Sequence, residues 1–389
     1  MADDLLLQEG EGANRSHHSD SPSPNEDKVI DGVDFISSLP DPILHVILSS
    51  IPTKFAIRTS ALSTRWRHVW CGTPTLSIDF LKRKRDAIME TLTRHYSAPR
   101  IISSNLCISD DVNSGQGVCL CSFVLPATTK SQVDSFIELG MAEMMFLAFR
   151  DPCFKNYEFP DLFYTNSSLK LLSVNTGNIV TVPTVVSWTS LRILYLNFCK
   201  LSDASFAKIL SGSPLLESLA LFYCLDLEHL DLSGSLKLRR LAIDTLGPMQ
   251  IVAPHVHCLT LNHTHHKCDL VTVSSLTEAS VDITCTELEV FCTSDSGTDL
   301  VLLMIVDMLE KLKNAKKLTF GAIFLQILSL AEACDVPFPT LKVEVLTLKT
   351  VIAASVIPGI AKLLQNSPSL KKVKLDMVQR FIFIIPVYN

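Results

Sequence analysis

A chain of 389 residues is too long for one ordinary compact core, unless that core grows by repetition. The apolar fraction of 47% is high, but no apolar run approaches the roughly 18–20 residues that span a bilayer. A formal net charge of −6 gives no global reason to bind nucleic acid or an anionic membrane. The N-terminus does not resemble a secretory signal, so we expect a soluble protein of the cytoplasm, the nucleus or both, with its 12 cysteines reduced.

Residues 1–33 form a segment of distinct composition at the start of the chain. They are rich in Asp, Glu, Ser, Pro and Gly and nearly free of aromatic and β-branched residues. Such a segment cannot bury enough apolar surface to offset the entropy of ordering it. We therefore predict a disordered acidic tail.

Apolar residues at helical spacing begin near Ile36 and predict three short helices. Asp41 is predicted as the N-cap of the first, with proline at its first helical position. The apolar positions of this helix are Ile43, Leu44, Ile47, Leu48 and Ile51. Pro52 ends it, a second helix starts at Thr53, and the third carries Trp66 and Trp70 one turn apart. So small a module leaves apolar surface over, which indicates either a partner site or a cap on the following domain.

Beyond Thr75 the sequence repeats a strand pattern of the L-x-x-L-x-L type. The repeats recur at about 20–28 residues, the spacing of leucine-rich repeats, in which each strand is followed by a helical or irregular return. The clearest strands are 168–174, 190–196, 214–221, 236–243, 255–261, 341–348 and 369–375. Helical returns are predicted at 202–210 and 299–312, and the pattern is weakest over 85–140. A solenoid of this kind exposes a long face of strands to a binding partner.

No catalytic or metal-binding motif stands out, so we predict no catalytic residues, no metal and no cofactor. The sequence has no phosphate-binding loop, nucleophile elbow or H-E-x-x-H motif. Histidines and cysteines gather between His255 and Cys268, but without the ligand spacing of a zinc finger. The basic run 82–85 is compatible with a nuclear localisation signal or with an exposed turn.

Two segments of the chain resemble the two halves of the plant F-box. Two further segments resemble other parts of a plant F-box family. Residues 34–54, with L-P-D and P-T-K, and 59–70, with R-W-R-x-x-W, are similar to the two halves of the F-box. Residues 209–219 and 355–372 resemble F-box proteins with leucine-rich repeats and a C-terminal FBD segment. The resemblance implies an α/β chain: a three-helix F-box at 34–79, a leucine-rich-repeat solenoid at 80–340 and an FBD-like segment at 341–389. Because that segment commonly continues further in the family, we expect either a truncated segment or an apolar tail that folds back as a strand.

The resemblance also implies a function as the substrate-recognition subunit of an SCF-type ubiquitin ligase. In the family the F-box binds a Skp-type adaptor, which connects it to a cullin scaffold, and the repeats bind the protein to be ubiquitinated. Two alternatives remain: a Skp-binding repeat protein that acts outside a ligase, and an enzyme with an unrecognised site. The substrate and its binding residues stay unknown. The implied adaptor-binding residues are Leu39, Pro40, Ile43, Leu44, Ile47, Leu48, Ile51, Pro52, Leu62, Trp66 and Trp70.

Overall fold

The structure is a computed structural model that describes residues 35–80, 85–108, 127–149, 157–176, 182–263, 268–283 and 295–377. The chain divides into two units, 1–39 and 40–389, and each is described by itself. In the first unit the described residues form a turn, in which the Leu39 N–H donates to the Ile36 carbonyl at 3.1 Å. The predicted tail at 1–33, the basic run at 82–84 and the apolar end at 380–389 lie outside the described residues.

The second unit begins with the short helices that the sequence predicted. They are α1 (Asp41–Ser49), α2 (Thr53–Arg58), α3 (Trp66–Val69) and two 3-10 helices, η1 (Thr59–Ala61) and η2 (Trp70–Gly72). The predicted N-cap at Asp41 is wrong: Pro40 occupies that position in an extended conformation, and Asp41 is the first helical residue. The Asp41 carboxylate forms an ion pair with Arg65 at 2.8 Å.

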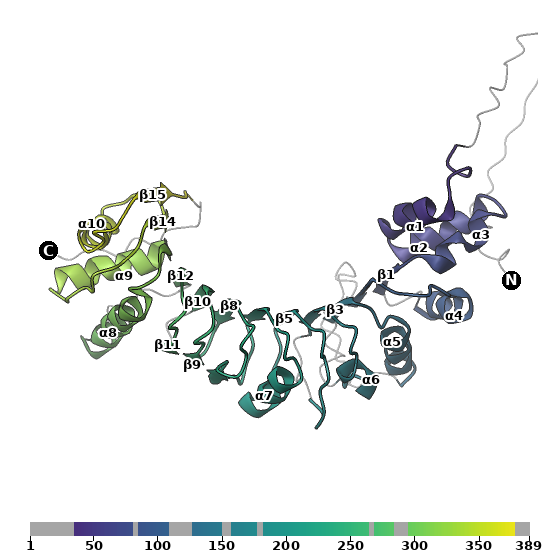
Figure 1. Cartoon of the computed structure of the whole chain (residues 1–389), viewed down its shortest axis with the longest axis horizontal. Helices are drawn as coiled ribbons and strands as arrows, with labels where there is room; N and C mark the ends of the chain where they lie inside the picture. The colour runs from purple at the N-terminus through teal and green to yellow at the C-terminus, as the bar shows by residue number, and fades with distance from the viewer. Residues whose placement is uncertain are drawn as a thin grey trace, which may run out of the picture. The chain divides into compact units, whose positions relative to one another are not determined.

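A parallel sheet follows these helices and runs through the rest of the described chain (Figure 1). In spatial order its twelve strands are β1 (Thr75–Phe80), β2 (Ser103–Ile108), β3 (Met144–Phe149), β4 (Leu171–Asn175), β5 (Ile193–Asn197), β6 (Ser218–Phe222), β8 (Arg240–Thr245), β10 (Cys258–His263), β12 (Glu278–Ile283), β13 (Lys317–Gly321), β14 (Val345–Lys349) and β15 (Lys372–Leu375). Each neighbouring pair is in parallel register, as stacked repeats require. The predicted fold class, an F-box followed by a repeat solenoid, is confirmed.

The segments between strands supply the second layer. Their helices are α4 (Arg85–His95), α5 (Ala127–Leu139), α6 (Asp161–Tyr164), α7 (Asp203–Ser211), α8 (Asp295–Leu312), α9 (Ala322–Ala333) and α10 (Ile357–Gln365). The returns predicted at 202–210 and 299–312 are confirmed as α7 and α8. Ser202 caps α7, because its hydroxyl accepts a hydrogen bond from the Ser205 N–H at 3.2 Å. Three returns instead form a small parallel sheet that the sequence did not predict, β11 (Cys268–Thr272), β9 (Met249–Val252) and β7 (His229–Asp231).

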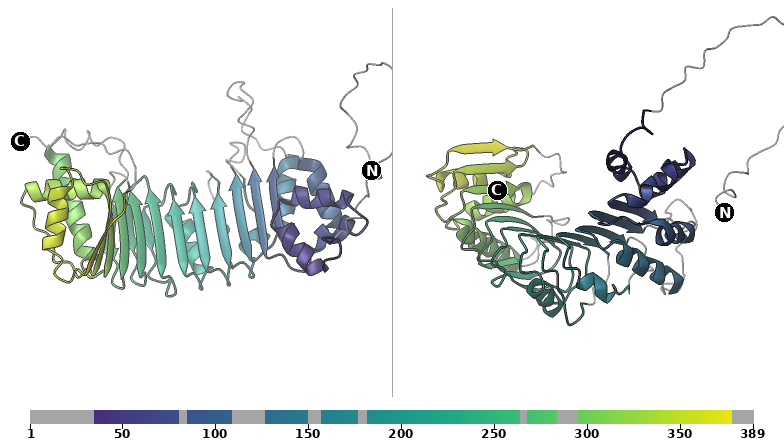
Figure 2. Two further views of the ribbon diagram at one scale, coloured as in Figure 1. Left: turned by 90° about the horizontal axis from the view of Figure 1, so that it is seen from above. Right: turned by 45° about the vertical axis from the view of Figure 1, so that its right-hand side comes forward.

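Leucines from successive strands form the core. Leu172, Leu194, Leu219 and Leu241 are neighbours in register, and all four are buried. The alternate strand residues are less buried and point to the other face of the sheet. We call this second surface the open face, and Figure 2 shows its central strands side by side with no described helix drawn over them. The repeat pattern thus gives each strand one buried side and one accessible side.

Candidate functional site: an apolar helix face and an open sheet face

Helix α1 separates its apolar residues into two stripes. Leu44 and Leu48, one turn apart, are 0% and 3% exposed and enter the core of the helical module. Ile43, Val46 and Ile47, at spacings of three and four residues, are 47%, 71% and 42% exposed. The second stripe is continuous apolar surface on one side of a helix, which is typical of a surface that binds a partner.

A further exposed apolar residue lies just before a turn that contacts the start of α1. Leu62 is 69% exposed, and the turn after it carries Arg65, whose guanidinium pairs with Asp41. Arg65 and Asp41 are 24 positions apart in the sequence, so this ion pair holds the turn against the N-terminal end of α1. Phe55 in α2 is also exposed, with the Lys54 ammonium 5.0 Å from its ring centre.

The two tryptophans lie inside the module. Trp66 and Trp70 are both buried, as are Leu44 and Leu48, so these four predicted adaptor-binding residues form the module's own core in this structure. Of the other predicted residues in this unit, Pro40, Ile43, Ile47, Pro52 and Leu62 are exposed and Ile51 is half-buried, while Leu39 belongs to the first unit. Sequence reasoning missed Val46, which follows Ile43 by three residues and therefore lies on the same side of α1.

Hydrogen bonds connect the helical module to the first repeat. The Ser77 N–H in β1 donates to the buried hydroxyl of Thr53 at 2.8 Å. The Ser97 N–H donates to the carbonyl of Cys71 at 2.9 Å. The Tyr96 hydroxyl donates to the Thr73 carbonyl, and burial raises the pKa of this phenol above its usual range. The module and the first repeat are therefore in direct hydrogen-bonded contact.

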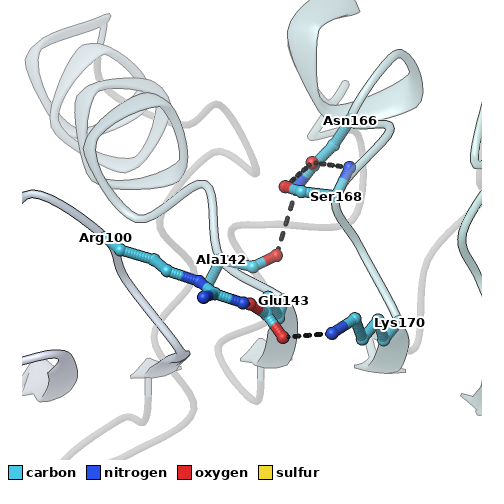
Figure 3. A network of polar contacts seen from close by, with 6 residues as sticks. All are labelled: Arg100, Ala142, Glu143, Asn166, Ser168 and Lys170. Carbon is cyan, nitrogen blue, oxygen red and sulfur yellow. Dashed lines mark hydrogen bonds and ion pairs between the residues drawn. The ribbon is translucent and has the colours of Figure 1, made fainter.

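The N-terminal edge of the sheet carries paired charges. Glu143, just before β3, accepts from both Arg100 and Lys170, with the Lys170 Nζ at 2.7 Å (Figure 3). Arg192 pairs in the same way with Glu217, and Lys371 with Glu344 at 2.6 Å. Opposite charges on neighbouring repeats thus neutralise each other along this edge.

The C-terminal end of the open face carries a different row of side chains. Six consecutive strands place equivalent residues in register there: Asn175, Asn197, Phe222, Asp244, Asn262 and Asp282. We call these residues the C-terminal row. Five of them have oxygen acceptors and none is basic. This row is therefore an acceptor-rich surface on the face that the helices leave open.

The histidine and cysteine cluster does not form a metal site in the part that the structure describes. Within those ranges no group of three or more possible ligands comes together. His257 contacts the carbonyl of His255 through Nδ1 at 2.9 Å, and His265 and His266 lie outside the described residues. The described cysteines are free thiols, and burial raises the pKa of Cys268 to about 12, which makes it a poor nucleophile.

Among the described helices none has the length and hydrophobicity of a membrane span.

Comparisons with known proteins assign both parts of this architecture. The family model for the F-box domain matches residues 36–76, and the model "FBD-associated F-box protein At5g56370, LRR repeats" matches residues 131–273. The chain is 51% identical over 361 residues to "F-box/LRR-repeat protein At5g02910" of Arabidopsis thaliana, covering 90% of this chain and 73% of that protein. It is 48% identical over 314 residues to "F-box protein At5g03100" of the same plant, covering 79% and 95%.

Proposed function

Because the chain belongs to the F-box/LRR-repeat family of plants, we propose that it is the substrate-recognition subunit of an SCF-type ubiquitin ligase. The helical module binds a Skp-type adaptor, the adaptor connects it to a cullin scaffold, and the repeats bind the protein to be ubiquitinated. The chain itself catalyses no step. Its contribution is to hold the substrate at high effective concentration near the ubiquitin carrier, in the cytoplasm, the nucleus or both.

The observation that carries this proposal is the outer stripe of α1. Ile43, Val46 and Ile47 present apolar side chains on one side of a short helix in the segment that matches the F-box. Leu62, Pro40 and Pro52 are exposed as well and complete the proposed adaptor surface. Leu44, Leu48, Trp66 and Trp70 are buried beneath this surface, in the core of the helical module.

The connection between the module and the repeats supports the positional role. Hydrogen bonds from Ser77 to Thr53 and from Ser97 to Cys71 tie the first strand and the first return to the helices. A substrate bound to the repeats is then held in a defined position relative to the adaptor. Positioning of this kind, without chemistry of its own, is what a recognition subunit requires.

Affinity purification of the tagged full chain from plant cells tests this proposal against its alternatives. A recognition subunit retains the adaptor and the cullin together. Retention of the adaptor without the cullin would favour a Skp-binding repeat protein that acts outside a ligase. If a folded chain retained neither, the proposal would be wrong, and the enzyme alternative would be the one to pursue. A matched purification of the Val46→Asp/Ile47→Asp variant should lose both proteins.

A further inference from the structure

Phe198 and Tyr223 form an exposed aromatic pair directly after strands β5 and β6. Their rings are stacked, with centroids 5.0 Å apart and planes 15° from parallel. Both residues have a φ of 53°, in the left-handed region that bulky side chains rarely adopt. Hydrogen bonds from the Phe198 N–H to Phe222 and from the Tyr223 N–H to Asp244, at 2.9 and 2.7 Å, hold this conformation.

The left-handed conformation determines where these rings point. The residues that follow them, Cys199 and Cys224, enter the core and are buried. Phe198 is 48% exposed, and Tyr223 is half-buried beside it. Strain of this kind persists only where the surrounding structure imposes it, and it concentrates at binding surfaces. The pair therefore presents an aromatic surface to solvent instead of adding to the core.

Asp244 lies next to this pair. It is the neighbour of Phe222 in register, and its carbonyl accepts from Tyr223. Asp244 as a residue is half-buried, but its Oδ1 is itself enclosed and has no hydrogen-bond partner within the described residues, and the same holds for the Oδ1 of Asn197. The described residues thus leave one oxygen of the Asp244 carboxylate without a donor.

No basic side chain of the C-terminal row neutralises Asp244. Arg240 is at the opposite end of the same strand, four residues and about 13 Å away along the backbone. The charged side chains of the N-terminal edge form ion pairs with one another. Lys200 follows Phe198 by two residues and Asp226 follows Tyr223 by three, so one positive and one negative charge lie beyond the aromatic pair.

Asp282, the other carboxylate of the row, has a structural use. A Cβ added at Gly321 would overlap the Asp282 carboxyl group, and Gly321 is the N-cap of α9. The carboxylate therefore lies at the positive end of that helix, where a negative charge is stabilised. Asp244 has no such neighbour, because the return after β8 leads into strand β9.

We propose that Phe198, Tyr223 and Asp244 form the site where the repeats bind an arginine side chain of the protein substrate. The inference rests on the proposed function and specifies which kind of side chain of the substrate the repeats recognise. A guanidinium is planar, stacks on an aromatic ring and donates paired N–H groups to a carboxylate. An aromatic pair at the surface, beside a carboxylate that forms no ion pair within the described residues, fits that group better than a neutral or acidic side chain.

Selection of a phage-displayed library of short random peptides on the purified full chain tests this site. Wild-type protein should enrich peptides that contain arginine. For the most enriched peptide, synthesised and labelled, we expect about tenfold weaker binding to Asp244→Asn, in line with loss of one charge-assisted hydrogen bond. Phe198→Leu/Tyr223→Leu, which keeps apolar bulk without the ring faces, should also weaken binding severalfold. Asp269→Asn removes the same charge from β11 in the small sheet and should bind as the wild type does.

Adaptor binding and the thermal midpoint are measured on the same preparations. Enrichment of acidic or purely apolar peptides, or of no peptides, would overturn the inference. So would an arginine preference that Asp244→Asn leaves unchanged. A wild-type chain that binds the adaptor but shows no arginine preference would therefore refute this site and leave the proposed function standing.

Discussion

The backbone N–H of Ser77 donates a hydrogen bond to the Thr53 hydroxyl at 2.8 Å, and this contact joins the helical module to the first strand of the sheet. Because β1 is the outermost strand, this N–H has no strand beside it to accept the bond. The buried side chain of α2 takes that place. A threonine in the F-box segment thus completes the edge of the repeat sheet.

Replacing Thr53 with valine tests this connection. Valine keeps the shape but removes the acceptor, so the Ser77 N–H is left unsatisfied and stability should fall by about 1–3 kcal/mol. Amide hydrogen exchange at Ser77 and urea unfolding measure the local and the overall effect. Thr53→Ser retains the hydroxyl and serves as the control. Equal exchange at Ser77 in the valine variant and the wild type would show that the bond does not connect the two parts.

Asp335 is in the left-handed conformation after the last turn of α9, with a φ of 54°. The Val336 N–H reaches back to the Ala331 carbonyl at 3.0 Å, as in helix ends that favour glycine. Asp335→Gly should therefore raise stability by about 0.5–1 kcal/mol, seen as a higher urea midpoint. Asp307→Gly, the same change inside α8, should lower stability by about 1 kcal/mol. Destabilisation by both substitutions would contradict this account.

Gly321 gives the Asp282 carboxylate room to lie at the start of α9. In Gly321→Ala the added methyl group would overlap this carboxyl group, and we expect a loss of about 1–3 kcal/mol. The backbone conformation is not the cause, because φ at this residue is −81°. In a chain that also carries Asp282→Ala, the substitution Gly321→Ala should lower the stability by less. A double-mutant cycle by urea unfolding measures this coupling, and additive effects would show that the two residues do not conflict.

Asp203 should make the stability of the repeats depend on pH. Partial burial favours a higher pKa, but hydrogen bonds from the backbone N–H groups of His229 and Glu228 outweigh it and hold the pKa below 3.8. A depressed pKa stabilises the fold above the unfolded value and loses that contribution as pH falls through the folded value. Asp203→Asn should therefore be less stable than the wild type at pH 7, with a gap that narrows below about pH 4. Urea unfolding midpoints of both proteins across this pH range test the prediction. A difference in stability that stays constant with pH would exclude the carboxylate as its cause.

Sequence reasoning predicted the architecture because the repeat pattern is local. Leucines at Leu172, Leu194 and Leu219 recur with the period of one coil, and each strand follows from its own alternation. The small sheet of β7, β9 and β11 was missed because its strands are short and carry only one to three apolar residues each. Periodicity cannot separate such returns from irregular loops.

The candidate site was predicted only in part, for a different reason. Spacing in α1 places Leu44 with Leu48 and Ile43 with Ile47, but it does not say which stripe faces the module's core. That depends on the elements that pack against α1, which include α3 and η2 with the buried Trp66 and Trp70. The aromatic pair at Phe198 and Tyr223 gave no sequence signal, because a left-handed φ at an aromatic residue follows from the register of neighbouring strands and not from its own preference.

The most direct test of the account is calorimetric titration of the purified full chain with a Skp-type adaptor. The wild type should bind, and Val46→Asp/Ile47→Asp should lose at least about thirtyfold in affinity, or about 2 kcal/mol, because charges enter an apolar contact. Val185→Asp alters an exposed valine in the repeats and should bind normally. A folded double variant that binds the adaptor as tightly as the wild type would contradict the assignment of the outer stripe of α1 as the docking surface.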